Sequence, residues 1–259
     1  MGLGSDYARL CAESGMDVVV VARSREKLEA LGEALAKKHG ITAHVVAVDL
    51  GRREAAAEIE AEVTRLGLTI DVLINNAGFG NTGAFVQAEL EKELSMIHVN
   101  VESLVALTHR FSRGMVSRGS GRILLIGSTA GFQPAPGMAV YCATKAFVVS
   151  FGAALAYELR GTGVTVTTHC PGATATEFAQ TAGNADTPIF KAGALVSTSA
   201  ACAEDGFADM NRGRGLTIHG FMNWISATFA PMLPLRFILA LAGGLLGWKP
   251  LGKAPRVAA

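Results

Sequence analysis

Charged residues are scarce in this sequence, and no run of them carries a single sign. Asp, Glu, Lys and Arg make up 17% of the 259 residues, and the formal net charge is +1. No Lys/Arg cluster and no basic stripe interleaved with aromatic residues is present, so we expect no nucleic-acid partner. Hydrophobic residues make up 50% of the chain, which indicates a globular protein with a large buried core.

Cysteines are also few, and their spacing favours neither a disulfide framework nor a metal centre. The four cysteines are Cys11, Cys142, Cys170 and Cys202. They form no CxxC pair and stand at no metal-ligand interval from a histidine, so we expect reduced core thiols and no metal. No basic and apolar leader precedes Ser5, and the sequence therefore predicts a cytoplasmic protein.

Apolar β-branched runs alternate with segments of helical periodicity. The runs, predicted as strands buried on both faces, cover residues 17–22, 44–49, 71–76, 121–128, 163–170 and 216–220. Helices are predicted over residues 6–14, 25–39, 52–66, 90–118 and 139–159, with an interruption near residue 100. This alternation predicts an α/β fold with a doubly wound parallel sheet, Rossmann-like, over residues 1–220. An apolar helical extension of the same domain is expected over residues 221–259.

Ligands bind outside the carboxyl ends of the strands in such a sheet. The sequence places NNAG (residues 75–78) and Ser128 after two of the strands, and Asn100 in the long helical stretch. Tyr141 and Lys145 are four residues apart and should share one helix face. An adjacent ammonium favours a phenolate, so Lys145 would bring Tyr141 into range for proton exchange with a carbonyl or alcohol oxygen. Ser128 would hydrogen-bond the same oxygen.

The motifs NNAG, HVN, IGSTAG, YCATK and CPGATAT follow one another in this order. In this combination the chain resembles the short-chain dehydrogenase/reductase family, in the branch of NADP(H)-type hydroxysteroid and 3-oxoacyl reductases. The resemblance covers residues 2–176 and implies an oxidoreductase with a catalytic tetrad of Asn100, Ser128, Tyr141 and Lys145. Asn100 would bend its helix and position a water leading toward Lys145. We also expect a homo-oligomer.

The same resemblance implies the contacts of a nicotinamide dinucleotide. Asn76, Ala77 and Gly78 would line the adenosine ribose, Asp49 would touch adenine, Lys145 would hold a ribose hydroxyl beside Tyr141, and Pro171, Gly172 and Thr176 would hold the nicotinamide end. For Asp49 an N-cap of the helix near residue 52 is an equal alternative.

The residue that follows the strand in the second-strand position of the fold bears on cofactor choice. NAD sites place an acidic side chain there, whereas an arginine accommodates a 2′-phosphate. The sequence has Ala22 and then Arg23, which predicts NADP(H) in preference to NAD(H). The alternative is that Arg23 is an ordinary solvated charge at the start of a helix.

Gly2, Leu3 and Gly4 match only the last three positions of the family's TGxxxGhG fingerprint, and the strand before it is absent. Losing about five buried apolar side chains at roughly 1.5–3 kcal/mol each would cost on the order of 10 kcal/mol, comparable to the stability of a whole domain. Two explanations stay open. Either the natural chain starts roughly a dozen residues earlier, or the chain is a non-catalytic binding or scaffold protein with a degenerate cofactor site.

The remaining sequence bears on the substrate. Residues 177–199 lack periodicity and are expected to form a lid. Apolar side chains there and on neighbouring loops predict a small apolar carbonyl or alcohol substrate; they are Phe178, Ile189, Phe190, Phe79, Phe85, Phe132 and Met138. The uncharged run from Phe237 to Trp248 is shorter than the about 20 residues that span a bilayer. We expect it to dock on the core or on a partner subunit, with peripheral membrane contact as the alternative.

Overall fold

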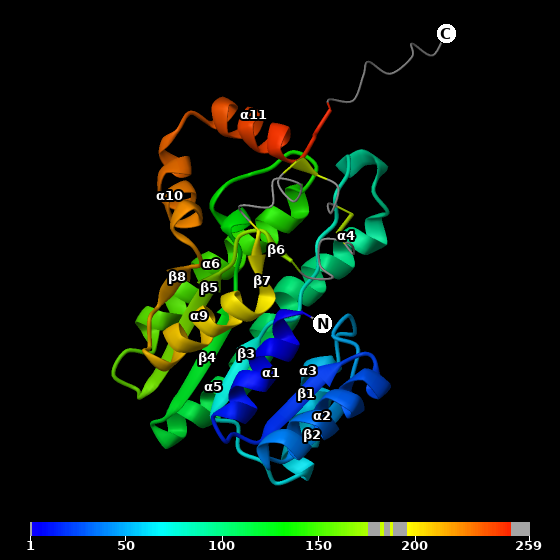
Figure 1. The fold of residues 1–259 in the computed structure, drawn as a ribbon, viewed down its shortest axis with the longest axis vertical. Coiled ribbons are helices and arrows are strands. Elements are labelled where there is room, and N and C mark those ends of the chain that lie inside the picture. The colour runs from blue at the N-terminus through cyan, green and yellow to red at the C-terminus, as the bar shows by residue number, and fades with distance from the viewer. Residues whose placement is uncertain (1, 176–181, 184–186, 189–195, 250–259) are drawn as a thin grey trace.

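The computed structural model describes residues 2–175, 182–183, 187–188 and 196–249, and it contains parallel strands with helices on both faces (Figure 1). Among these residues the main strands form two separate parallel groups. One group pairs β1 (Val18–Ala22) with β2 (Ala43–Ala47). The other has the order β3 (Val72–Asn75), β4 (Gly121–Ile126), β5 (Val164–Cys170) and β8 (Leu216–Ile218). The doubly wound parallel fold is therefore confirmed.

The helices form a layer on each side of the strands. One layer contains α1 (Leu3–Glu13), α2 (Arg25–His39) and α9 (Ser199–Asn211). The opposite layer contains α3 (Ala55–Arg65), α5 (Leu104–Arg118) and α6 (Ala139–Glu158). The other described elements are η1 (Phe85–Gln87), α4 (Leu90–Ile97), the π-helical η2 (His98–Ser103), η3 (Thr129–Phe132), β6 (Thr174–Ala175), β7 (Ser197–Thr198), α10 (Phe221–Phe229), η4 (Ala230–Met232) and α11 (Leu235–Leu245).

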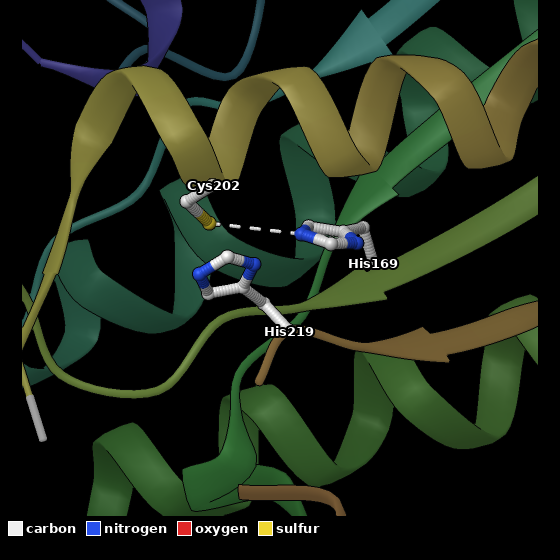
Figure 2. Close-up of side chains that lie close together, drawn as sticks. All are labelled: His169, Cys202 and His219. Atoms are coloured by element: carbon white, nitrogen blue, oxygen red, sulfur yellow. Dashed lines mark hydrogen bonds between the residues drawn. The ribbon is translucent and has the colours of Figure 1, made fainter. Parts of the chain in front are cut away.

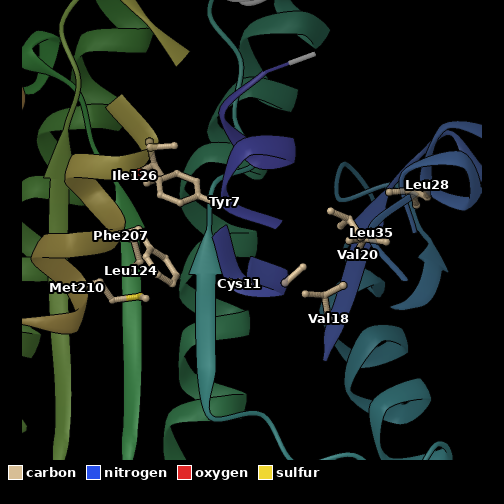
Figure 3. Close-up of a cluster of buried hydrophobic side chains, with 12 residues drawn as sticks. Tyr7, Cys11, Val18, Val20, Leu28, Leu35, Leu124, Ile126, Phe207 and Met210 are labelled. Atoms are coloured by element: carbon tan, nitrogen blue, oxygen red, sulfur yellow. The ribbon is translucent and has the colours of Figure 1, made fainter. Parts of the chain in front are cut away.

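No strand of the described chain lies between β1 and β3, as the sequence predicted. A cavity of about 760 Å³ lies there instead, lined by the facing residues of both strands. Helix α1 connects the two groups, because Tyr7 and Cys11 belong to one buried cluster with Val18 of β1 and Leu124 of β4 (Figure 3). The core is thus continuous through α1 although the sheet is divided.

Most predicted elements lie within a few residues of those observed. The interruption near residue 100 is the π-helical turn η2, which contains Asn100. The N-cap alternative for Asp49 is wrong, because α3 begins only at Ala55 and its N-cap is Glu54. The Asp49 carboxylate instead accepts a hydrogen bond from the backbone N–H of Gly51, 2.9 Å away.

Candidate active site

A cavity of about 750 Å³ opens at the carboxyl ends of the strands and brings most of the predicted site residues together. The predicted residues in its wall are Gly2, Leu3, Arg23, Asp49, Asn76, Ala77, Gly78, Ser128, Tyr141, Lys145, Pro171 and Gly172. Asn100 lies behind the wall, and Gly4 lines the cavity between β1 and β3 instead. Thr176 falls outside the described residues.

Tyr141 and Lys145 occupy successive turns of α6 and are both buried. Lys145 Nζ lies 5.9 Å from the centre of the Tyr141 ring and donates a hydrogen bond to the Ile126 carbonyl at 2.8 Å. The loss of solvation on burial lowers the pKa of Lys145 to about 8. The ammonium therefore exchanges its proton close to neutral pH.

The expected lowering of the Tyr141 pKa by Lys145 is wrong for this structure. Burial raises the pKa of Tyr141 above its ordinary value, because the phenolate would lose its hydration. A hydrogen bond with Ser128 acts in the opposite direction but is the smaller effect. The Tyr141 hydroxyl is thus protonated at neutral pH, which is the form that donates a proton. Ser128 itself accepts a hydrogen bond from the N–H of Ala130 at 3.1 Å.

Asn100 braces the loop that follows β3. Its side-chain oxygen accepts from the N–H of Phe79 at 3.0 Å, and its Nδ2 donates to the Phe79 carbonyl at 2.9 Å and to Thr144 Oγ1 at 3.1 Å. The bend of the helix at Asn100 is a π turn, a feature frequently found at functional sites. Asn100 therefore fixes the position of residues 76–79 relative to α6.

Two glycines allow close approach at this end of the cavity. A Cβ on Gly78 would lie 3.0 Å from Asn100 Oδ1 and 3.6 Å from Lys145 Nζ. A Cβ on Gly4 would lie 2.7 Å from Asn76 Nδ2, so glycine lets the first turn of α1 rest against the loop after β3. The amino end of α1, where backbone N–H groups favour an anion, thereby reaches the cavity wall at Gly2.

Arg23 lies exposed in the cavity wall directly after β1. No described residue forms an ion pair with it, whereas Arg25 pairs with Glu29 at 3.6 Å. Ser24, which follows, caps α2 by accepting a hydrogen bond from the Lys27 N–H at 3.4 Å. The guanidinium of Arg23 is thus available to a ligand anion.

The far end of the cavity is apolar, partly through residues that the sequence did not indicate. Ala242, Leu245 and Leu246, at and after the carboxyl end of α11, belong to its wall. Their only signal in the sequence is the apolar run from 237, which was predicted to dock but not to line the site. Of the predicted loop residues, Phe79 and Met138 are in the wall.

Other substrate predictions fail or cannot be assessed. Phe85 is 60% exposed on η1 and is absent from the cavity wall, and Phe132 is also absent from it. The prediction was wrong for both, which lie in the short helical turns η1 and η3. Phe178, Ile189 and Phe190 of the expected lid lie outside the described residues.

Comparisons with known proteins agree with this geometry. A model of a family described as short chain dehydrogenase matches residues 1–187. A very-long-chain 3-oxoacyl-CoA reductase of Anas platyrhynchos is 34% identical over 184 residues, which are 69% of this chain and 58% of that protein. An NADP-dependent 3-hydroxy acid dehydrogenase of Salmonella typhi is 39% identical over 172 residues, 66% of this chain and 68% of the other.

Solved structures are similar over nearly the whole chain. A short-chain dehydrogenase from Sphingobium yanoikuyae in complex with NADPH has a TM-score of 0.79 and 30% identity, covering 100% of this chain and 94% of its own. A 7β-hydroxysteroid dehydrogenase has a TM-score of 0.83 and 26% identity, covering 93% of each chain. The chain nevertheless spans only 58% of the length of the avian reductase.

Proposed function

This chain belongs to the short-chain dehydrogenase family, and from that premise we propose that it interconverts a carbonyl compound and a secondary alcohol with NADP(H). The observation that supports this most is the convergence of Ser128, Tyr141 and Lys145 on one cavity that also reaches the amino end of α1. A proton donor, a hydrogen-bond partner for the reacting oxygen and an anion-binding helix end are thereby present together.

The residues of the cavity fit a nicotinamide dinucleotide. A Cβ on Gly78 would lie only 3.0 Å from Asn100 Oδ1, so glycine keeps this part of the wall open. The amino end of α1 at Gly2 presents the backbone N–H groups of a helix start, which suit a phosphate. Asp49, Asn76 and Ala77 would hold the adenosine end, and Pro171 and Gly172 the nicotinamide end. When bound, the nicotinamide supplies or accepts the hydride. Arg23 is exposed and forms no ion pair with any described residue, which supports NADP(H) over NAD(H) because a guanidinium can bind the 2′-phosphate.

The chain's own residues would manage the proton. In the reduction direction Tyr141 donates its hydroxyl proton to the substrate oxygen, and Ser128 hydrogen-bonds that oxygen as negative charge develops on it. Lys145, whose pKa is lowered to about 8, is suited to return a proton to Tyr141 and to hold a ribose hydroxyl. Asn100 holds the loop at Phe79 against helix α6 through its hydrogen bonds to Phe79 and Thr144, and it makes no substrate contact.

The substrate is an apolar ketone or the matching secondary alcohol. Phe79, Met138, Leu245 and Leu246 give the cavity an apolar end. The similarity to a long-chain 3-oxoacyl reductase and a hydroxysteroid dehydrogenase supports the same class of substrate. NADPH consumption should be measured with long-chain 3-oxoacyl thioesters, ketosteroids and hydrophilic sugar ketones. Turnover confined to the hydrophilic ketones would contradict the substrate class.

The Tyr141→Phe variant tests the mechanism in the same assay. It should lose at least about a hundredfold in kcat, the scale of one general acid, while NADPH still raises the melting temperature. Undiminished turnover by Tyr141→Phe would contradict this role of Tyr141 and would mean that another group donates the proton. Met138→Leu is a conservative control in the cavity wall and should retain most of the activity.

The carboxyl-terminal helices support an interaction with a further apolar surface. Over residues 221–248 Arg236 is the only charged residue. Large apolar side chains are exposed on or beside α10 and α11, among them Phe221, Met222, Trp224, Met232, Leu235, Phe237 and Leu241. A second subunit of a homo-oligomer or a membrane surface would cover them. Light scattering in solution would detect a homo-oligomer. Flotation with lipid vesicles would detect membrane binding, and binding through this surface should be weaker for Phe237→Ser than for the wild type.

By length and hydropathy α6 is the one described helix that could cross a membrane. It nevertheless packs against β4, β5 and β8 and contains the buried Tyr141 and Lys145, which is the position of a core helix.

The divided sheet favours one alternative, a non-catalytic binding or scaffold protein. The pair β1 and β2, which would hold the adenosine end, shares no strand hydrogen bonds with the group of β3, β4, β5 and β8, after whose strand β4 Ser128 lies. If the cofactor site were degenerate for this reason, NADPH would not raise the melting temperature. A clear rise with saturating NADPH would exclude the alternative.

A further inference from the structure

Three potential metal ligands that lie far apart in the sequence meet on the α9 side of β5, outside the active-site cavity (Figure 2). His169 belongs to β5, Cys202 to α9, and His219 follows β8. One nitrogen of each imidazole and the Cys202 Sγ all lie within 4.8 Å of one another. Cys202 Sγ is 3.6 Å from His169 Nε2, close to the separation of neighbouring ligands around one tetrahedral ion.

Both imidazoles are anchored through their Nδ1 atoms by oxygens outside the cluster. His169 Nδ1 is 2.9 Å from Thr217 Oγ1, and His219 Nδ1 is 2.7 Å from Asp205 Oδ2. Metal-ligating histidines characteristically use their second nitrogen in this way, with a carboxylate or another oxygen as the partner. The anchoring leaves Nε2 of each ring for a ligand, and His169 already directs it at the Cys202 sulfur.

The surroundings contain an unexplained buried polar atom. Tyr7 is 1% exposed, and its hydroxyl has no hydrogen-bond partner among the described residues. A Cβ on Gly206 would lie 2.3 Å from that hydroxyl and 2.9 Å from Cδ2 of His169, so Tyr7 borders the cluster. A bound water or ion is one of the arrangements that satisfy such a buried hydroxyl. A water in the fourth position of a bound ion would satisfy it.

Negative charge lies near the cluster. Asp205 and Asp209, both on α9, act electrostatically on His169. Asp209 also pairs with Arg214 at 3.1 Å, whereas Asp205 contacts the cluster directly through His219 Nδ1. A cation held by the three side chains would therefore have a carboxylate beside it.

We propose that His169, Cys202 and His219 form a site for a Zn²⁺-like divalent transition metal. Two imidazoles and one thiol suit such an ion and not Mg²⁺ or Ca²⁺, which prefer oxygen. On binding, the Cys202 S–H bond breaks, the proton passes to solvent, and the sulfur binds the ion without any change of oxidation state. The site would join β5, α9 and the segment after β8, which makes it a stabilising site. Sequence spacing did not predict it, because the fold alone brings the three residues together.

The test uses the full-length protein freed of metal by a chelator and then incubated with Zn²⁺ or Co²⁺. We expect one equivalent of zinc to survive desalting, a higher melting temperature, and a thiolate-to-cobalt charge-transfer band with Co²⁺. Asp205→Asn removes the carboxylate that holds His219 Nδ1 and should weaken zinc binding roughly 10- to 100-fold, the usual effect of losing the hydrogen-bond partner of a ligating histidine.

Variants assign the ligands. Cys202→Ser and His219→Gln should each abolish the cobalt band. His219 is partly exposed, so His219→Gln disturbs the core less and serves as the test if Cys202→Ser does not fold. Cys11→Ser replaces another buried cysteine, which has no imidazole partner among the described residues, and should keep the band. No retained zinc and no cobalt band in the wild type, or a band that survives His219→Gln, would overturn the proposal and leave a hydrogen-bonded packing cluster.

Discussion

Removal of the Arg23 guanidinium should weaken NADPH binding and leave NADH binding unchanged. Arg23 is exposed in the cavity wall after β1 and has no ion-pair partner among the described residues, so its loss leaves no buried charge behind. The two cofactors differ only in the 2′-phosphate. If substitution of Arg23 raises the dissociation constant of NADPH more than that of NADH, Arg23 contacts that phosphate.

The magnitude follows from the exposure of Arg23. A hydrogen bond to a charged group contributes about 1.5–3 kcal/mol, and solvent screening places an exposed one at the lower end. About 1.5 kcal/mol corresponds to roughly a tenfold change in Kd. For Arg23→Ala we therefore expect NADPH to bind about ten times more weakly at low salt, and the difference should shrink as ionic strength rises.

Titration of cofactor fluorescence against wild type, Arg23→Ala and Arg25→Ala provides the assay. Arg25 is a matched control, since it is exposed two residues away but pairs with Glu29 and does not line the cavity. Equal weakening of NADPH and NADH by Arg23→Ala, or an equal effect of Arg25→Ala, would refute the role of Arg23 and restore its interpretation as a solvated charge.

We make three further predictions, for Lys145, Tyr7 and Gly78. Lys145→Met should raise the free energy of unfolding at pH 7 by about 3 kcal/mol, because the lysine pKa falls from 10.5 to about 8 on folding. Between pH 8 and 10.5 the lysine is protonated in the unfolded wild-type chain but not in the folded one, so the free energy of unfolding should rise with pH across that window. Urea unfolding at several pH values should show this rise in the wild type and not in Lys145→Met. Tyr7→Phe removes a buried hydroxyl that has no hydrogen-bond partner in the part of the chain that the structure describes, and it should stabilise the metal-free protein by about 1 kcal/mol in the same measurement. A loss of stability would reveal a partner. Gly78→Ala pushes a methyl group to 3.0 Å from Asn100 Oδ1, so kcat should fall roughly tenfold with little change in secondary structure by circular dichroism, and an unaltered kcat would show that the loop can yield.

The fold could be predicted from the sequence because apolar β-branched runs alternate with segments of helical periodicity. The run at residues 163–170 is β5 almost residue for residue, and the interruption near Asn100 is a π turn. The division between β1 and β3 also agrees with the pattern of strands, the first of which is predicted at residues 17–22. In each case a local pattern and a general rule of sheet packing were sufficient.

The features that could not be predicted depend on tertiary contacts. The pKa of Tyr141 was expected to fall beside Lys145, but the burial of α6 raises it, and burial cannot be judged from a spacing of four residues. The wall contributed by Leu245 and Leu246 depends on where α11 folds back. The meeting of His169 with Cys202 depends on the packing of α9 against β5.

In the proposed reaction a nicotinamide exchanges hydride with an apolar carbonyl compound, and Tyr141 donates the proton. Incubation of the protein with a long-chain ketone and NADPH that carries deuterium at the transferable position, followed by mass spectrometry of the alcohol, tests this reaction. We expect one deuterium on the carbinol carbon for the wild type and almost no product for Tyr141→Phe. Failure of the wild type to transfer deuterium to any apolar ketone, while NADPH still raises its melting temperature, would contradict the proposed reaction and leave a nucleotide-binding protein without this activity.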